Sequence, residues 1–198
     1  MAKIEKFKKT AKKVWNFLVH EDSWASFVAD LIIIIIFAKF ILYPGIGLVL
    51  GTSYPIVAVV SDSMDHHNQD FDTWWGEKGE FYEELNISKE EFRKFYLADG
   101  FKKGDVLVIR GKPPNELEIG DVVVFSEKSR NNPIIHRVVE IEGEGVYSVK
   151  GDANSVQLDF EKNVKYEEIE GKGILMIPKI GWVKVGVVEL FNYISNLV

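Results

Sequence analysis

The longest apolar segment of the chain runs from Trp24 to Tyr43 and contains five consecutive isoleucines. Its 20 residues extend about 30 Å as a helix, which matches the hydrocarbon core of a bilayer. Trp24 and Tyr43 stand at its ends, where aromatic rings favour the headgroup level, and Asp30 is its one acidic residue. The segment therefore predicts a transmembrane helix over 24–43. The alternative is a helix buried in a soluble core, where such a run of isoleucines is unusual.

Beyond this segment the apolar residues come in short runs bounded by turn residues, which is typical of β-strands. The expected strands are 56–60, 106–110, 121–126, 134–141, 146–150, 173–177 and 182–186. Strands of this length and spacing predict a mainly β fold, built on a twisted, partly closed antiparallel sheet. Residues 142–145, Glu-Gly-Glu-Gly, are expected to form a hairpin turn between two of the strands.

Residues 65–104 interrupt the strand pattern with a polar and aromatic stretch followed by a helical one. Ser88 and Glu91 have the spacing of a capping box, which predicts a helix that starts after Ser88. We therefore expect an insertion that contains α-helix and forms a cap or subdomain.

The last residues, 187–198, have apolar side chains at helical spacing and predict an amphipathic C-terminal helix. The helix is too short to span a bilayer. It is expected either to pack on the sheet or to lie at the membrane interface, and the pattern does not separate these two alternatives.

Charge indicates the topology of the chain. Residues 1–23 contain six lysines and three acidic residues, whereas the whole chain has a net charge of −6. By the positive-inside rule, residues 1–23 form a cytoplasmic basic segment, and residues 44–186 form an extracytoplasmic domain. Tyr43-Pro44-Gly45 follows the apolar run in place of a small-x-small cleavage site, so an uncleaved signal anchor is expected.

Composition narrows the possible chemistry. The chain has no cysteine, which excludes disulfides, cysteine-bound metals and thiol catalysis. An acidic body without a basic patch argues against nucleic acid as the main partner. No histidines have metal-ligand spacing, so neither a metal nor another cofactor is expected. A nucleophile would have to be a hydroxyl, an amine or a carboxylate.

A hydroxyl nucleophile needs a nearby base, and the chain has four histidines. His20 falls in the cytoplasmic segment, and the adjacent His66 and His67 are expected on a loop surface. His136 lies in an apolar strand, where alternation places it on the face opposite Arg137. On this pattern alone, His136 is either a catalytic base or a histidine of the core.

Polar residues follow two of the expected strands. Ser61-Asp62-Ser63-Met64 comes directly after strand 56–60, where a rigid support can expose a serine hydroxyl. Asp152 follows Gly151 at the end of strand 146–150, and a carboxylate there could hold the Nδ1 proton of His136. Each motif taken alone is also ordinary turn chemistry.

The motifs in combination are more specific than any one of them. They are Ser61-Asp62-Ser63-Met64 after the anchor, Gly120-Asp121-Val122-Val123-Val124-Phe125, His136-Arg137-Val138-Val139 and Gly151-Asp152-Ala153-Asn154, in this order. The ordered set resembles the type I signal peptidases. It looks most like their archaeal and endoplasmic-reticulum branch, in which histidine replaces the catalytic lysine of most bacterial relatives.

The resemblance implies roles for individual residues. Ser63 matches the nucleophile and His136 the general base, while the Ser61 hydroxyl and the Ser63 backbone N–H match the oxyanion donors. Asp152 matches the acid of the Gly-Asp-Asn box, although Ala153 stands where the family has Asn. Asp159 resembles a second acid, at a gap of seven residues where six is usual. Which of Asp152 and Asp159 contacts His136 is left open.

The resemblance also implies a function. It predicts a membrane-bound serine endopeptidase that removes signal peptides from secretory preproteins after small residues, in a cell membrane or the endoplasmic-reticulum membrane. The expected partners are the preproteins, the lipid bilayer, and other membrane subunits or the translocon. The alternative is a non-catalytic, membrane-anchored β-domain that serves as a scaffold.

The insertion at 65–104 is the largest departure from the family pattern. It adds about 40 residues beside Ser63. Because of this position, we expect it to cover the cleft, with Trp74 and Trp75 in contact with either substrate or membrane.

Overall fold

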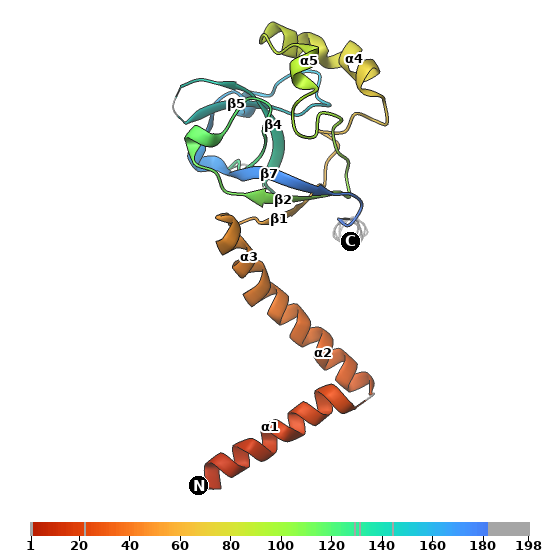
Figure 1. Ribbon diagram of the computed structural model, residues 1–198, viewed down its shortest axis with the longest axis vertical. Helices are drawn as coiled ribbons and strands as arrows, with labels where there is room; N and C mark the ends of the chain where they lie inside the picture. The colour runs from red at the N-terminus through yellow and green to blue at the C-terminus, as the bar shows by residue number, and fades with distance from the viewer. Residues whose placement is uncertain (1, 22, 129, 131, 144, 182–198) are drawn as a thin grey trace, which may run out of the picture. The chain divides into compact units, whose positions relative to one another are not determined.

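The computed structural model describes residues 2–21, 23–128, 130, 132–143 and 145–181 (Figure 1). The expected strand at 182–186 and the expected C-terminal helix at 187–198 lie outside the described residues. The chain divides into two compact units, with the boundary between Ile46 and Gly47.

The N-terminal unit is helical. Helix α1 (Ala2–His20) is followed by α2 (Trp24–Phe37), the π-helical turn η1 (Ala38–Leu42) and α3 (Tyr43–Leu50). Together the last three form one helix, Trp24–Leu50, that is long and apolar enough to cross a membrane. The helix therefore extends beyond the expected end at Tyr43. Pro44 lacks an N–H, and the π-turn immediately before it lets the Tyr43 N–H reach the Ala38 carbonyl while the helix continues.

The described part of the second unit forms a seven-stranded antiparallel sheet in the order β1-β2-β7-β3-β4-β5-β6. Its strands are β1 (Ile56–Ala58), β2 (Val106–Arg110), β3 (Val122–Phe125), β4 (Ile134–Ile141), β5 (Val146–Lys150), β6 (Val164–Lys165) and β7 (Ile169–Ile177). Register shifts between Val108 and Ile109 and between Val124 and Phe125 are irregularities that bend a sheet. The sheet is curled into a half-barrel, which confirms the predicted fold class.

Each face of the sheet packs its own apolar cluster. One cluster includes Val57, Leu107, Val122 and Val124, and the other includes Val123, Phe125, Tyr147 and Val149. Alternation along β3 thus sends consecutive valines to opposite sides. Both faces of the sheet are buried here, which fixes the register of β3 and β4 and with it the direction of each side chain on β4.

The insertion carries helices α4 (Phe71–Glu84) and α5 (Lys89–Phe92). The expected capping box at Ser88 is confirmed, but α5 ends after about one turn, and Leu97 has a positive φ of 56°. Trp74 and Trp75 are 1% and 6% exposed. They lie in an aromatic core shared with Phe92 and with Val139 of β4, so, contrary to expectation, they offer no surface to substrate or membrane.

Short turns complete the described fold. They are the 3-10 turns η2 (Pro114–Glu116), η3 (Asp159–Glu161) and η4 (Tyr166–Glu168). Of these, η3 matters most for the site, because it brings an acidic segment back to β4.

Candidate active site

A surface groove of about 530 Å³ runs beside the end of β1 and contains both Ser63 and His136. Apolar side chains form much of its wall, among them Ala58, Val60, Ile135, Leu158 and Phe160. Ser61 and Asn154 contribute further polar groups. None of the residues 65–104 lines this groove, so the insertion does not cover it.

Ser63 lies in the turn that follows β1. Its side chain is partly buried, and its Oγ lies 3.2 Å from the Ser61 Oγ. Its carbonyl accepts a hydrogen bond of 2.9 Å from the backbone N–H of Ala153. The loop after β5 therefore holds the backbone of the serine, while the serine hydroxyl faces the groove.

His136 lies on β4 opposite Val123 and is 4% exposed. A Cβ added at Gly151 would lie 2.8 Å from both the His136 Nε2 and the Ser63 carbonyl oxygen. Nε2 thus faces the small space beside Ser63, and only a glycine at 151 leaves that space open. The other ring nitrogen, Nδ1, lies 2.6 Å from Glu161 Oε1.

Glu161 is fully buried at the end of η3. Its second oxygen, Oε2, accepts a hydrogen bond of 2.5 Å from the Leu158 N–H, which fixes the carboxylate in front of His136. Glu161 is not among the site residues expected from the sequence. The Leu158-to-Glu161 spacing, in which an acid caps the start of its own turn, was the one available signal.

Asp159 does not meet His136. Its side chain is fully exposed and pairs with Lys162 at 3.1 Å. Asp159 and Glu161 are two residues apart in a 3-10 turn, which places their side chains about 240° apart around the turn axis. Glu161 therefore faces the core, and Asp159 faces water.

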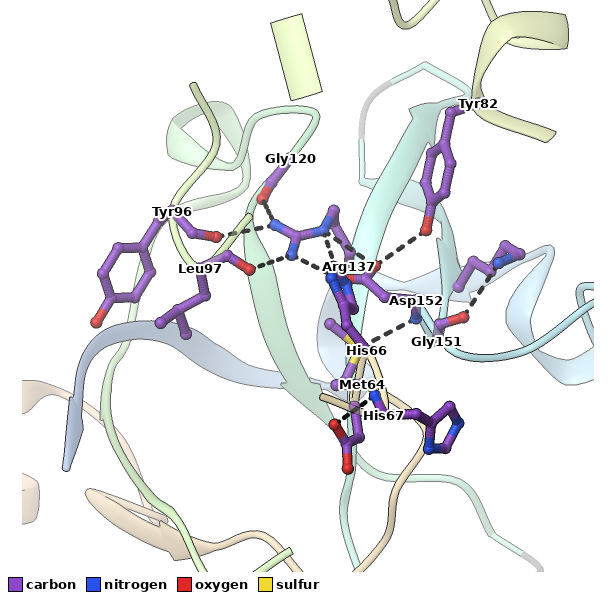
Figure 2. Close-up of polar contacts among 12 residues, drawn as sticks. Met64, His66, His67, Tyr82, Tyr96, Leu97, Gly120, Arg137, Gly151 and Asp152 are labelled. Atoms are coloured by element: carbon purple, nitrogen blue, oxygen red, sulfur yellow. Dashed lines mark hydrogen bonds and ion pairs between the residues drawn. The ribbon is translucent and has the colours of Figure 1, made fainter. Parts of the chain in front are cut away.

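Asp152 does not meet His136 either. It binds Arg137, with Oδ2 2.7 Å from one terminal nitrogen and both oxygens within 3.2 Å of Nε (Figure 2). Arg137 follows His136 on β4, and neighbours on a strand point to opposite faces. The structure thus gives the two carboxylates separate partners, Glu161 with His136 and Asp152 with Arg137.

Charges in this network shift several pKa values. Burial alone would raise the pKa of Asp152, but the Arg137 charge and hydrogen bonds, with a contribution from His66, hold it well below its usual range. Burial and the Asp152 charge raise the pKa of the Tyr82 hydroxyl well above normal. The Tyr82 hydroxyl therefore stays protonated, and it donates a hydrogen bond of 3.0 Å to Asp152 Oδ1.

His66 and His67 differ in environment. His67 is exposed, as expected, but His66 is 3% exposed and stacks on Trp74 with ring centroids 3.8 Å apart. His66 belongs to the insertion core, because its ring fills the space between Trp74 and Asp152. In the described part of the chain, no group of three or more His, Asp or Glu side chains is placed to hold a metal ion.

The second unit has the architecture of a signal-peptidase-type domain, with a curled antiparallel sheet and a serine that shares one groove with a buried histidine. An apolar helix of sufficient length to cross a membrane precedes it. Comparison with known proteins identifies the branch of that class.

No protein-family model matches the chain. Its relatives include proteins named signal peptidase complex catalytic subunit SEC11. The one from Scheffersomyces stipitis is 25% identical over 162 residues, covering 77% of this chain and 76% of the relative. The one from Lachancea thermotolerans is 25% identical over 164 residues, covering 77% of each. A third, from Emericella nidulans, is 27% identical over 121 residues, which is 59% of this chain and 45% of the relative. The chain is a homologue of these catalytic subunits, which confirms the family resemblance seen in the motifs.

Proposed function

We propose that the chain is a membrane-bound serine endopeptidase that removes signal peptides from secretory preproteins. Ser63 is the nucleophile, His136 the general base and Glu161 the acid that orients His136. The observation that carries this proposal is the arrangement around the imidazole, with Nδ1 at 2.6 Å from Glu161 Oε1 and Nε2 facing the space beside Ser63. The names of the relatives support the same reaction.

The chemical steps follow from this geometry. The Ser63 hydroxyl passes its proton to His136 Nε2 as Oγ attacks the carbonyl carbon of the scissile peptide. The Ser63 backbone N–H and the Ser61 hydroxyl donate to the oxyanion. When the intermediate collapses, the C–N bond breaks and His136 returns the proton to the leaving amine. A water molecule then hydrolyses the acyl-enzyme by the same proton route.

Within residues 2–181 as described, β1 pairs with β2 on one edge only, and its other edge supports binding of an extended peptide. Val59 exchanges backbone hydrogen bonds with Gly104 and Asp105 on the β2 side. By alternation, the backbone groups of Ala58 and Val60 face the other edge, next to the groove. A substrate added there as a strand would place its scissile bond at Ser63, and the resemblance to the family predicts small residues before the cut.

The helix Trp24–Leu50 supports a tethered enzyme. The lysines of residues 1–23 predict a cytoplasmic N-terminus, with the β-domain on the outer or lumenal side of the cell or endoplasmic-reticulum membrane. A signal peptide lies in the same bilayer, so tethering raises the effective concentration of enzyme and substrate. Since the relatives are named subunits of a complex, other membrane subunits or the translocon are proposed partners.

The test is cleavage of a preprotein by the purified full chain in detergent or nanodiscs. Ser63→Ala and His136→Ala should each abolish cleavage, whereas Ser155→Ala, outside the groove, should retain it. Equal cleavage by all variants would refute the serine–histidine mechanism. No cleavage by wild type, even with its complex partners present, would favour the scaffold alternative.

A further inference from the structure

The insertion begins and ends beside the nucleophile. Asp65 comes two residues after Ser63, and the chain returns where the Phe101 N–H donates to the Met64 carbonyl at 3.0 Å. Three residues later, the Gly104 N–H donates to the Val59 carbonyl at 3.0 Å. The turn that carries Ser63 is therefore closed on one side by the folded insertion.

The insertion also surrounds the Arg137–Asp152 pair (Figure 2). The backbone carbonyls of Tyr96 and Leu97 accept from Arg137 at 2.9 and 2.8 Å, and the ring of Phe92 lies 4.8 Å from its guanidinium carbon. The Tyr82 hydroxyl donates to Asp152. Arg137 and Asp152 are both fully buried. A buried ion pair is stable only when its remaining polar groups are satisfied, and here the insertion supplies most of those partners.

The loop that contains Asp152 connects this network to the catalytic residues. A Cβ added at Gly151 would lie 2.8 Å from His136 Nε2, and the Ala153 N–H donates to the Ser63 carbonyl at 2.9 Å. The Asp152 N–H itself points to the Met64 sulfur at 3.4 Å. The loop that carries Asp152 therefore lies against both Ser63 and His136.

We propose that the insertion 65–104 is a positioning module for the active site, and that Tyr82 and His66 are positioning residues that act through Asp152. Tyr82 fixes Oδ1 of Asp152 by a hydrogen bond. His66, packed on Trp74 with its Nε2 3.8 Å from Oδ2, closes the other side of the carboxylate. This inference rests on the proposed function, because the geometry it sets is that of the serine and histidine.

Tyr82→Phe tests the module, since it removes only the hydroxyl. The matched control is Tyr166→Phe, which removes a hydroxyl that donates to the Lys112 carbonyl, outside the groove. Preprotein cleavage is measured at least about 20 °C below the unfolding midpoint of each variant, so that every sample is folded. We expect kcat of Tyr82→Phe to fall about 10-fold with KM within about twofold, because small displacements of reacting groups are costly. Tyr166→Phe should match wild type.

Hydrogen–deuterium exchange supplies a readout that does not depend on activity. Exchange across residues 151–154 and 61–64 should accelerate in Tyr82→Phe and in His66→Ala, and stay at the wild-type rate in Tyr166→Phe. Unchanged exchange in those segments, or an unchanged kcat in an active Tyr82→Phe enzyme, overturns the positioning role. Accelerated exchange in a protein that never cleaves preprotein would refute the proposed function alone.

A different feature, the surface of helix α1, carries a second inference. Ile4, Phe7 and Trp15 are 63%, 74% and 63% exposed, and Phe7, Trp15 and Leu18 line one shallow groove. The rest of the helix surface carries Lys3, Lys6, Lys8, Lys9, Lys12 and Lys13, with Glu5 as the only acidic residue of α1. An apolar stripe flanked by lysines is the pattern of a helix that lies in the plane of an anionic membrane surface.

The connection to α2 supports this placement. The Ser23 side chain caps α2 by accepting from the Ser26 N–H, and the Ser26 Oγ donates to the Phe17 carbonyl at 2.7 Å. The chain therefore passes within a few residues from the basic helix to the apolar segment that begins at Trp24. We propose that the apolar stripe of α1 binds the lipid bilayer next to that segment, with its lysines on anionic headgroups.

The absence of cysteine makes this proposal testable with single labels. Phe7→Cys on the stripe and Lys9→Cys on the basic side are labelled with a polarity-sensitive fluorophore, in the full chain in nanodiscs of phosphatidylcholine with or without about 30% phosphatidylglycerol. We expect a blue shift only at position 7, larger with phosphatidylglycerol and reduced when Lys3, Lys6, Lys12 and Lys13 are changed to Gln. Equal emission at both positions, or no response to lipid charge, overturns the proposal. A blue shift that needs added partner subunits would assign the stripe to a protein and so also overturn it.

Discussion

Nδ1 of His136 lies 2.6 Å from Glu161 Oε1, and both side chains are almost completely removed from water. In the proposed mechanism, this carboxylate orients the imidazole from the Nδ1 side, so that Nε2 accepts the Ser63 proton. In that mechanism it also stabilises the imidazolium that forms during the reaction. Four predictions follow from this contact and from the groups around it.

Glu161→Gln should lower kcat by about 100-fold or more, because the amide can donate to Nδ1 and so favour the wrong tautomer of His136. KM should change little, since Glu161 does not line the groove. Steady-state cleavage of a preprotein measures both constants. Asp159→Asn, at an exposed position two residues away, is the matched control and should behave as wild type. If kcat instead fell in Asp159→Asn and not in Glu161→Gln, Asp159 would be the acid that orients His136.

Gly151→Ala should abolish most activity without unfolding the domain. The added Cβ would lie 2.8 Å from His136 Nε2, from the Ser63 carbonyl and from Asn154 Nδ2, so at least one of them must move. Gly76→Ala is the control, because a Cβ there meets nothing within 4 Å and alanine favours the helix by about 0.5–1 kcal/mol. Thermal unfolding and preprotein cleavage of both variants check this. Full activity of Gly151→Ala would mean that Nε2 does not face this space during catalysis.

The Asp152 carboxylate should make the domain sensitive to acid. Its pKa is held low in the folded state, so its contribution to stability is complete above the unfolded pKa of about 3.9 and is lost as the pH falls below that value. Asp152→Asn should remove this part of the pH dependence. It should also destabilise the domain at neutral pH by about 3–5 kcal/mol, because Arg137 is left buried without its partner charge.

Urea unfolding from pH 7 to pH 3 measures whether the free energy of unfolding falls more steeply with decreasing pH in wild type than in Asp152→Asn. Asp159→Asn serves as a surface control for general charge effects. If the stabilities of wild type and Asp152→Asn changed with pH in parallel, the pKa of Asp152 would not be lowered on folding.

Lys150 should make stability rise with pH in alkaline solution, a slope of the same sign as that of Asp152 but in a higher pH range. Burial lowers its pKa to about 8, while its amine donates to the Gly151 carbonyl at 3.1 Å. In the unfolded chain its pKa is about 10.4, so the unfolded state binds more protons between about pH 8 and pH 10, and stability rises with pH in that window. The full effect is about 3 kcal/mol. Lys150→Met should flatten the rise, which denaturant unfolding at pH 7, 8, 9 and 10 would detect. A wild-type stability that falls steadily from pH 8 to pH 10 would contradict this reading.

The sheet was largely predictable from the sequence because its strands follow a local pattern. The bounds of β2, β4 and β5 match the expected ranges, since alternating or continuous apolar runs end there at turn residues. Strand β6 escaped detection because it has two residues. Strand β7 starts at Ile169, four residues before the expected start. Its early part pairs with β3, a long-range contact that no local pattern contains.

The active site was predictable only in part. Ser63 and His136 could be proposed because Ser63 follows a recognisable strand and His136 lies within one, and the structure brings both to one groove. The acid beside His136 was not found, because its identity depends on how η3 docks against β4. Asp152 had the stronger motif, but it pairs with Arg137, which alternation along β4 places on the face opposite His136. A motif can specify that a carboxylate is present at a loop without specifying the face of the sheet to which the loop turns.

The order of the site residues along the chain has a consequence for biosynthesis. Ser63 precedes the insertion, and Glu161 is the last of the proposed catalytic groups to be synthesised. At about 5–20 residues per second, the chain needs roughly 5–20 s to extend from the serine to the glutamate. During that interval the nascent protein carries its proposed nucleophile without the acid proposed to orient its base. The proposed mechanism therefore keeps the chain inactive after its apolar helix has been made, and activity begins only when the second unit is nearly complete.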